Sequence, residues 1–405
     1  MFEGQPKGLF ALALANTGER FGYYTMLAVF VLFLQENFGW SAGLAGTYYS
    51  TFLMFVYFLP FVGGILADKF GYGKMVKIGI SIMFLGYVLL AVPLGNGGAA
   101  VSAIIGALAL ISIGTGLFKG NLQVMVGELY ASPEMAGKRD SAFSLFYMAI
   151  NIGALFAPTA AVEIMKYAQS IGFNKADSYH FAFGVACVSL IISILIYFAT
   201  RSTFRHVEGG HAAVPAKDNS AAVAAEPELS KEDTKARIVA LCLVFAVVIF
   251  FWMAFHQNGL TLTYFAAEFT QQSATGISSM LFDVKNLVMV IIAIYASFAV
   301  VQSKTQKARI IATAVTLLCA VGIIYNGLTV GNHTVDVSAP IFQQFNPCFV
   351  VGLTPVSVAL FGWLAARKKE PTAPRKIAYG MIVAAIGFGI MIFGSTGISP
   401  LENQV

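Results

Sequence analysis

Two charged residues lie near the middle of an apolar segment close to the N-terminus. Residues 9–35 read LFALALANTGERFGYYTMLAVFVLFLQ, a run long enough to cross a bilayer with some tilt. Asn16, Glu19, Arg20 and Tyr23 are spaced i, i+3, i+4, i+7, which places them on one face of a helix. Ionisable groups at such depth usually face a bundle interior or a wet cavity, where they pair and often relay protons. The alternative is a structural Glu–Arg pair that fixes helix packing.

Three more polar residues lie in apolar segments of the first half. Lys119, in GTGLFKGNLQ, is flanked by glycines that let helices approach closely. It could line a cavity as a cation, or extend to the membrane interface. Tyr147 and Asn151 are spaced i, i+4 and share one helix face. Asn151 could also join two helices by a hydrogen bond.

The second half has two comparable features. His256 and Asn258 interrupt the apolar segment FFWMAFHQNGLTLTYFAAE, and histidine is the side chain that titrates near neutral pH. A coupling role and a structural role both remain open for His256. In FQQFNPCFVVGLTP, Asn346 precedes Pro347, which breaks or kinks the helix and frees carbonyl groups that can line a cavity.

A charged stretch separates two of the apolar segments. In GGILADKFGYGKMVK, Asp68 and Lys69 follow glycines that allow a tight helix end. Their position at a segment end predicts a role in gating and orientation rather than substrate contact.

The composition places the chain among polytopic membrane proteins. It has 405 residues, of which 58% are hydrophobic and 11% charged, whereas soluble domains carry about 25% charged residues. The mean hydropathy is +0.75. The net charge of +5 arises from Lys and Arg at segment ends, so no nucleic-acid partner is expected. The four cysteines have no metal-ligand spacing, no HExxH motif occurs, and neither an enzyme nor a metal or organic cofactor is expected.

Eleven apolar segments are long enough to be membrane-spanning helices. They fall near 8–35, 45–67, 75–94, 99–119, 141–166, 180–200, 237–267, 285–302, 309–328, 346–366 and 376–394. In lipid, such segments must satisfy their own backbone hydrogen bonds, which predicts an all-α protein. Alternate connections are rich in Lys and Arg, so the positive-inside rule places the N-terminus in the cytoplasm.

One polar stretch divides the chain. Residues 206–236 are polar and alanine-rich and are interpreted as a cytoplasmic linker. A six-helix bundle at 1–205 precedes it, and a partial second bundle at 237–405 follows. Two six-helix halves joined by a cytoplasmic loop are a common plan among transporters.

The motifs together resemble one known family. They read, in order, NTGERFGYY, YFLPFVGGILADKFG, GTGLFKGNLQVMVGELY, FSLFYMAINIGALFAP, FFWMAFHQNGLTLTYFA, FQQFNPCFVVGLTP and KIAYGMIVAAIGFGIMIFG. This pattern resembles the proton-dependent oligopeptide transporters, a branch of the major facilitator superfamily. The resemblance covers most of the chain and rests on several independent motifs.

The resemblance implies a fold and a function. It implies two six-helix halves around a central cavity, and uptake of di- and tripeptides by alternating access with protons as the coupling ion. It places Tyr23, Tyr24, Tyr57, Lys119 and Asn151 in the first half of the peptide site and Asn346 in the second half. Tyr147, one turn from Asn151, is added to this substrate-binding set. We expect a monomer in the bacterial inner membrane, with small peptides and the lipid bilayer as its partners.

Three departures concern proton coupling. The family's first motif usually begins with Glu where this chain has Asn16, and a basic residue usually stands where it has Leu27. The seventh helix usually carries Glu where it has His256. The coupling set predicted here is Glu19, Arg20 and His256, and the hypothesis is that Glu19 and His256 share the coupling role.

Two further departures concern architecture. The spans 285–302 and 309–328 have no counterpart in the family's core and are interpreted as an inserted peripheral hairpin at 285–328. The alternative is that they are core helices. After GSTGISPLENQV the family continues with three more core helices, so the chain is expected to be truncated at its C-terminus. A related transporter of nitrate, amino acids or drug-like molecules, or a non-transporting receptor on the same fold, are the functional alternatives.

Overall fold

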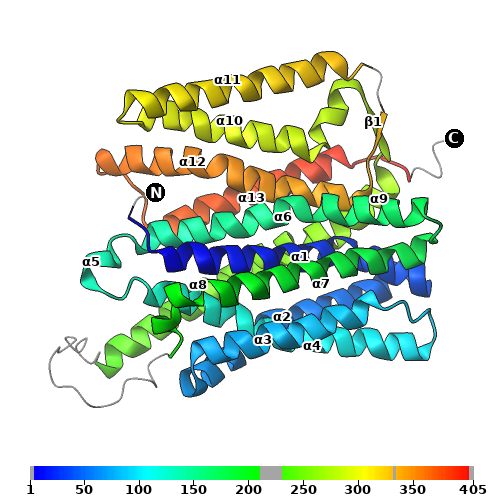
Figure 1. Cartoon of the computed structure of the whole chain (residues 1–405), viewed down its shortest axis with the longest axis horizontal. Coiled ribbons are helices and arrows are strands. Elements are labelled where there is room, and N and C mark those ends of the chain that lie inside the picture. The colour runs from blue at the N-terminus through cyan, green and yellow to red at the C-terminus, as the bar shows by residue number, and fades with distance from the viewer. Residues whose placement is uncertain (1–3, 210–229, 332–333, 401–405) are drawn as a thin grey trace.

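The computed structural model describes residues 4–209, 230–331 and 334–400, and most of them are helical (Figure 1). The first half contains α1 (Lys7–Phe38), α2 (Ala42–Phe70), α3 (Tyr72–Ala91), α4 (Gly98–Glu128), α5 (Pro133–Ala136), α6 (Arg139–Ser170) and α7 (Lys175–Ala199), then two 3-10 turns, η1 (Arg201–Thr203) and η2 (Arg205–Val207). Side chains cap the helices where the chain turns: Ser41 accepts from the Leu44 amide and Asn174 from the Asp177 amide.

The second half contains a broken helix, a hairpin and two further long helices. Its elements are α8 (Lys231–Phe255), η4 (His256–Gly259), α9 (Thr261–Phe269), β1 (Ser273–Thr275), η5 (Gly276–Leu281), α10 (Val284–Gln302), α11 (Gln306–Thr329), β2 (Thr334–Asp336), η6 (Ala339–Gln344), α12 (Phe345–Ala366) and α13 (Ala373–Gly394). The two strands pair antiparallel, with Ser273 opposite Asp336.

Ten helical segments in the described part of the chain are long and apolar enough to cross a membrane. The eleventh expected span is α1, which is 32 residues long and carries Glu19 and Arg20 near its middle. The all-α membrane fold expected from the sequence is therefore confirmed. Residues 210–229 of the expected linker lie outside the described residues, and α8 begins at Lys231 rather than at residue 237.

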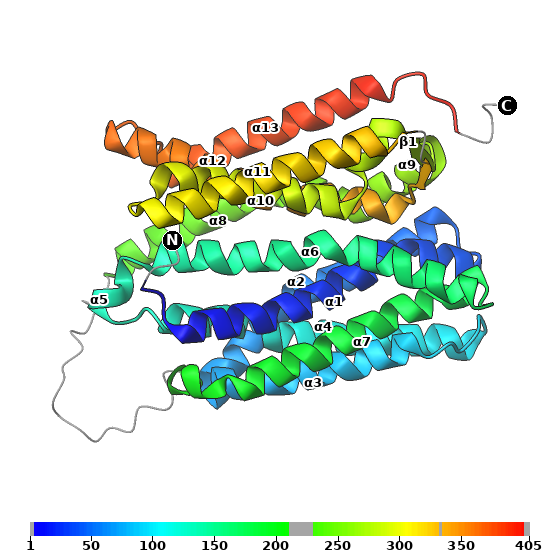
Figure 2. The same ribbon diagram turned by 45° about the horizontal axis from the view of Figure 1, so that its top comes forward.

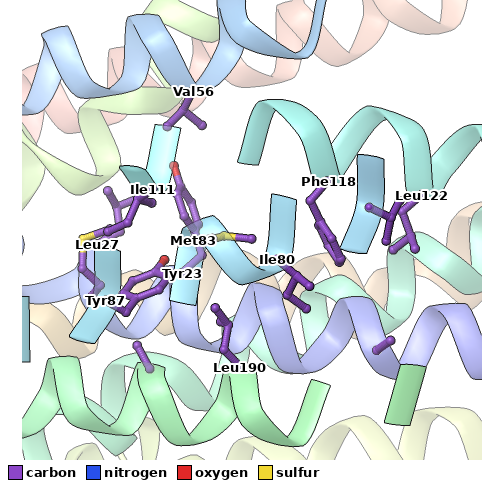
Figure 3. Close-up of a cluster of buried hydrophobic side chains, with 14 of the residues drawn as sticks. Tyr23, Leu27, Val56, Ile80, Met83, Tyr87, Ile111, Phe118, Leu122 and Leu190 are labelled. Carbon is purple, nitrogen blue, oxygen red and sulfur yellow. The ribbon is translucent and has the colours of Figure 1, made fainter. Parts of the chain in front are cut away.

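The first half packs around α1. This helix contacts α6 and α7 along much of its length, while α4 packs against α2 and α3. Side chains from α1, α2, α3, α4 and α7 form the core, among them Leu27, Val56, Met83, Ile111 and Leu190 (Figure 3). Gly63 lets α2 cross α4 closely, since a Cβ there would lie 2.1 Å from the Gly116 carbonyl oxygen.

The second half is packed more loosely. No residue of α8 is buried, whereas α10 and α11 lie antiparallel against each other and α10 also contacts α12. The two halves meet chiefly where α6 contacts α12 and η6. In Figure 2, α6 lies between the remaining helices of the first half and those of the second. The end of the bundle where the N-terminus lies is called the N-terminal end, and the opposite end the far end.

Candidate functional site

Two adjoining cavities lie between the halves. The smaller has a volume of about 80 Å³ and the larger about 660 Å³. Six residues line both, so the two form one continuous space that we call the central cavity: Tyr24, Tyr57, Asn151, Phe255, Asn258 and Asn346. Leu27 and Pro158 line the smaller part, which lies nearer the far end. Arg20 and Gln123 line the larger part, which lies nearer the N-terminal end.

All seven residues of the substrate-binding set predicted from the sequence line the central cavity. They are Tyr23, Tyr24, Tyr57, Lys119, Tyr147, Asn151 and Asn346. They come from α1, α2, α4, α6 and α12, so five helices and both halves contribute to one site. Their placement agrees with the prediction, while their role in binding stays a prediction.

An aromatic cluster links the lysine to the histidine. The Lys119 ammonium lies 4.6 Å from the centre of the Tyr57 ring, a cation–π contact. The Tyr57 ring in turn meets the His256 ring edge to face at 5.1 Å between centroids, and Trp252 stacks on His256 at 5.8 Å. In the described part of the chain, Lys119 forms no ion pair with a carboxylate, so its charge is available to a ligand.

His256 lies where its helix breaks. Continuous hydropathy through residues 250–268 predicts one helix, but α8 ends at Phe255 and a 3-10 turn follows before α9. Gly259 lies close to α2 at this break, because a Cβ there would lie 2.3 Å from the Tyr49 hydroxyl. The break turns His256 and Asn258 toward the smaller part of the cavity and brings the broken segment against α2.

Glu19 and Arg20 form a buried pair. Glu19 is 0% and Arg20 3% exposed, and the guanidinium donates hydrogen bonds from Nε and Nη2 to the two carboxylate oxygens. The Arg20 guanidinium also lies 4.6 Å from the centre of the Tyr23 ring. Arg20 lines the central cavity, but Glu19 and Asn16 are not among its lining residues. Of the four residues expected on one helix face, only Arg20 and Tyr23 line the cavity, and Glu19 is linked to it through Arg20.

Hydrogen bonds between the halves gather toward the far end. The Gln343 amide donates to the Ala28 carbonyl at 3.2 Å and to the Thr263 hydroxyl at 3.0 Å. The Tyr264 hydroxyl donates to the Ala42 carbonyl at 3.3 Å. The bonds to Ala28 and Ala42 join α1 and α2 to the second half, whereas the bond to Thr263 lies within the second half. Gln343 lines the smaller cavity, so these bonds lie at its far-end side.

Asp68 and Lys69 lie outside the central cavity. Asp68 is exposed at the N-terminal end and accepts a hydrogen bond of 2.6 Å from the Tyr72 hydroxyl, across the turn between α2 and α3. Lys69 is exposed and lies 5.5 Å from the Phe70 ring centre. Neither residue lines the central cavity, and their gating role stays a prediction.

Sequence reasoning did not assign several residues that line the cavity. Tyr49, Trp252, Asn258 and Gln343 all contribute to its wall or to its closure. Asn258, two positions after His256 in an apolar segment, was the clearest signal available for such a role. Tyr49 and Trp252 gave no signal, since an aromatic residue in an apolar run is most often part of the packing.

Comparison with known proteins identifies relatives along nearly the whole chain. The sequence profile of the POT family (PTR2) matches residues 74–229. The "Uncharacterized transporter YclF" of Bacillus subtilis (strain 168) is 30% identical, over 97% of this chain and 74% of that protein. A "Di-/tripeptide transporter" of Lactococcus lactis subsp. lactis is 26% identical, over 96% of this chain and 76% of that protein.

The fold is similar to solved transporters as well. A crystal structure of the peptide transporter POT in complex with sulfate superposes with a TM-score of 0.58 at 25% identity, covering 98% of this chain and 77% of that one. These relatives are membrane transporters and not enzymes. The residues, the fold and the relatives agree that this chain is an integral membrane protein that belongs to the POT family of transporters.

Proposed function

We propose that the chain imports di- and tripeptides together with protons by alternating access. The observation that supports this best is the make-up of the central cavity, in which both halves surround one ammonium group with tyrosine hydroxyls and asparagine amides. Two relatives, each 26% identical, are named "Di-/tripeptide transporter" in Lactococcus lactis subsp. lactis and "Dipeptide and tripeptide permease B" in Salmonella typhimurium. The peptide substrate is the part of this proposal that goes beyond family membership.

Each group in the cavity suits one part of a short peptide. The Lys119 ammonium attracts the terminal carboxylate, because it forms no ion pair within the described residues. The Tyr23 hydroxyl is buried without a hydrogen-bond partner in the described part of the chain and can bond to the ligand. Asn151 and Asn346 can bond to peptide groups from opposite halves, so substrate side chains need not be recognised.

The positions of Lys119 and His256 suggest how protons are coupled to substrate. Both lie against the Tyr57 ring, so a proton on His256 places a second positive charge close to Lys119. Like charges oppose each other, and a substrate carboxylate between them relieves that repulsion. Protonation and carboxylate binding then favour each other by the same coupling free energy. Glu19 contributes through Arg20, whose charge it balances.

Access is proposed from the N-terminal end. The basic connections place this end in the cytoplasm by the positive-inside rule, so hydrogen bonds at the far end close the cavity toward the outside. In this state the chain would face inward. Uptake requires the bonds of Gln343 and Tyr264 to break while Asp68 and Lys69 take part in closing the opposite end. The proton gradient drives the cycle with about 2.3 kcal/mol per charge per 100 mV.

A small anion such as nitrate is the second candidate substrate. Arg20 and Lys119 line the cavity, and none of its lining residues in the described part of the chain is a carboxylate. A zwitterionic peptide also has an ammonium group, which would need an acceptor such as a tyrosine or an asparagine oxygen. An anion has no such need.

Uptake by proteoliposomes tests the two candidates together. The purified chain should accumulate labelled dialanine under an inward proton gradient, and a protonophore should abolish accumulation. Lys119→Gln should remove accumulation, whereas Lys231→Gln, at the exposed start of α8, should leave it unchanged. Accumulation of nitrate without dialanine would favour the anion, and binding of dialanine without accumulation would point to a receptor.

A further inference from the structure

A separate cavity lies at one side of the bundle, between α6 and the helices α10, α11 and α12. It has a volume of about 730 Å³, within the range of about 300–1,000 Å³ typical of ligand pockets. We call it the lateral slot. It is lined by residues of α6, α10, α11 and α12 and of the turn between α10 and α11, among them Met148, Tyr295, Ala299, Ser303, Ala308 and Val351. None of these residues lines the central cavity.

The wall of the lateral slot is almost entirely hydrocarbon. Its polar side chains are Tyr295 and Ser303. The Tyr295 hydroxyl donates to the Val351 carbonyl at 3.1 Å and lies 3.3 Å from the Met148 sulfur, so it serves to hold α10 against α12 and α6. A cavity lined this way offers water too few hydrogen-bond partners, and an apolar guest fits it better.

Small residues line the slot toward one end. Ala296 and Ala299 of α10 and Ala308 and Ala312 of α11 leave space between the two helices and α6. The last lining residues, Ser303 and Ala308, lie at the turn that joins α10 to α11. This turn lies at the N-terminal end of the bundle, so the slot leads to the membrane surface there (Figure 2).

Three basic residues lie in or next to the turn at that mouth. Lys304, Lys307 and Arg309 are exposed, and the Arg309 guanidinium donates to the Ser303 carbonyl at 3.4 Å. No carboxylate forms an ion pair with them in the described part of the chain. The positive-inside rule would account for the basic residues alone, but not for an apolar slot beside them. Together, the slot matches the acyl chain of an anionic lipid and the basic residues match its head group.

We propose that the lateral slot holds an acyl chain of an anionic glycerophospholipid, with the phosphate at Lys304, Lys307 and Arg309. The bound lipid would fill the space between α6 and the α10–α11 hairpin and so brace the hairpin against the first half. This proposal does not depend on the transported substrate. It assigns the hairpin a lipid-binding role that the central cavity does not require.

Native mass spectrometry tests the head-group part of the proposal. The chain in mixed micelles with equal amounts of phosphatidylglycerol and phosphatidylcholine should retain phosphatidylglycerol selectively. Changing Lys304, Lys307 and Arg309 together to Ala should weaken this binding about 100-fold, since each basic group near anionic lipid contributes about fivefold. The matched control changes Arg367, Lys368 and Lys369 to Ala, an equal loss of charge at the α12–α13 turn, whose residues do not line the slot. Equal weakening in both triple variants would overturn the proposal, because the effect would then be one of net charge.

Filling the slot tests the acyl-chain part. Ala299→Leu and Ala308→Leu add side-chain volume inside and at the mouth without changing charge. Each should reduce retained phosphatidylglycerol several-fold, while thermal unfolding in phosphatidylcholine alone should match the wild type and show that the variants fold. If the filled variants retain phosphatidylglycerol as the wild type does, the lipid is bound at the surface only and the slot assignment is wrong.

Discussion

Two groups of charged or titratable side chains lie near each other in the bundle, and their surroundings differ. Glu19 and Arg20 are almost fully buried and bond to each other within α1. Lys119 and His256 come from opposite halves and are half-buried, with the aromatic ring of Tyr57 between them instead of a carboxylate. The first pair is internally balanced, so its main effect falls on the fold. The second leaves charge available, so its main effect falls on a ligand or a proton.

The largest expected effect is a loss of folding stability when the Glu19–Arg20 pair is broken. Glu19→Gln leaves Arg20 charged and without a counter-ion in a buried site, which costs about 3–5 kcal/mol of folding free energy. Unfolding in detergent should report this loss. The control is Glu36→Gln, which removes an exposed pair with Lys175 of 2.8 Å and should cost about 1 kcal/mol or less. Equal losses in the two variants would contradict the assignment of Glu19 to the packed interior.

Lys119→Gln should give the opposite pattern. Loss of a charge-assisted hydrogen bond to the substrate carboxylate should weaken dipeptide binding about 10- to 100-fold. Stability should hardly change, because Lys119 forms no carboxylate pair in the described part of the chain. Dipeptide affinity and thermal unfolding, measured on the same sample, test the expected loss of binding and the expected unchanged stability. A variant that loses stability but keeps its affinity would make Lys119 a structural residue.

His256→Gln should change pH dependence more than affinity. Histidine ordinarily titrates near pH 6.5, so its removal should flatten proton-driven dipeptide uptake between about pH 5 and 8. Dipeptide exchange without a proton gradient should change by less than about threefold, because the Lys119 charge remains. The matched control is His206→Gln, an exposed histidine in η2. An unchanged pH profile in the His256 variant would assign coupling to another group.

Much of this architecture could be predicted from the sequence, for a physical reason. Lipid allows only long, self-satisfied helices, so hydropathy alone located spans closely, as at 285–302 against Val284–Gln302. Polar residues are rare enough in such spans that Lys119, Asn151 and Asn346 stood out, and all three line one cavity.

Other features depend on packing that no local pattern contains. The break at His256 interrupts a segment whose hydropathy is continuous, and it is associated with the approach of Gly259 to Tyr49 on another helix. The direction in which Glu19 points depends on how α1 is rotated within its neighbours. The lateral slot arises only where α6, α10, α11 and α12 meet, so no single segment indicates it.

A carboxylate at the N-terminal end of the bundle, Glu208, can be compared with the buried Glu19. The Glu208 carboxylate accepts hydrogen bonds from Arg201 at 2.6–3.0 Å and from Tyr197 at 3.1 Å, and lies 3.6 Å from the Lys77 ammonium. Its backbone carbonyl accepts from the Gly73 amide at 2.9 Å. These contacts hold the segment after α7 against the start of α3. Unlike Glu19, this carboxylate lies where protons and solvent can reach it.

The smallest expected effect is therefore the one that depends on pH. Burial by itself raises the pKa of Glu208, but the hydrogen bond from Arg201, the nearby Lys77 and the hydrogen bond from Tyr197 outweigh it and leave the pKa below its ordinary value. As the pH falls, Glu208 takes up its proton in the unfolded chain before it does so in the folded chain. The stability that the Glu208 carboxylate contributes is therefore complete above its ordinary pKa and is lost as the pH falls through the folded-state pKa. Glu208→Gln should cost about 1 kcal/mol at pH 7, and the gap to the wild type should close in acid below the ordinary pKa. The measurement is the free energy of unfolding of the variant and the wild type from pH 7 down to acid, with Glu134→Gln at an exposed position as the control. A stability difference that stays constant with pH would show that the Glu208 carboxylate acts by packing and not by charge.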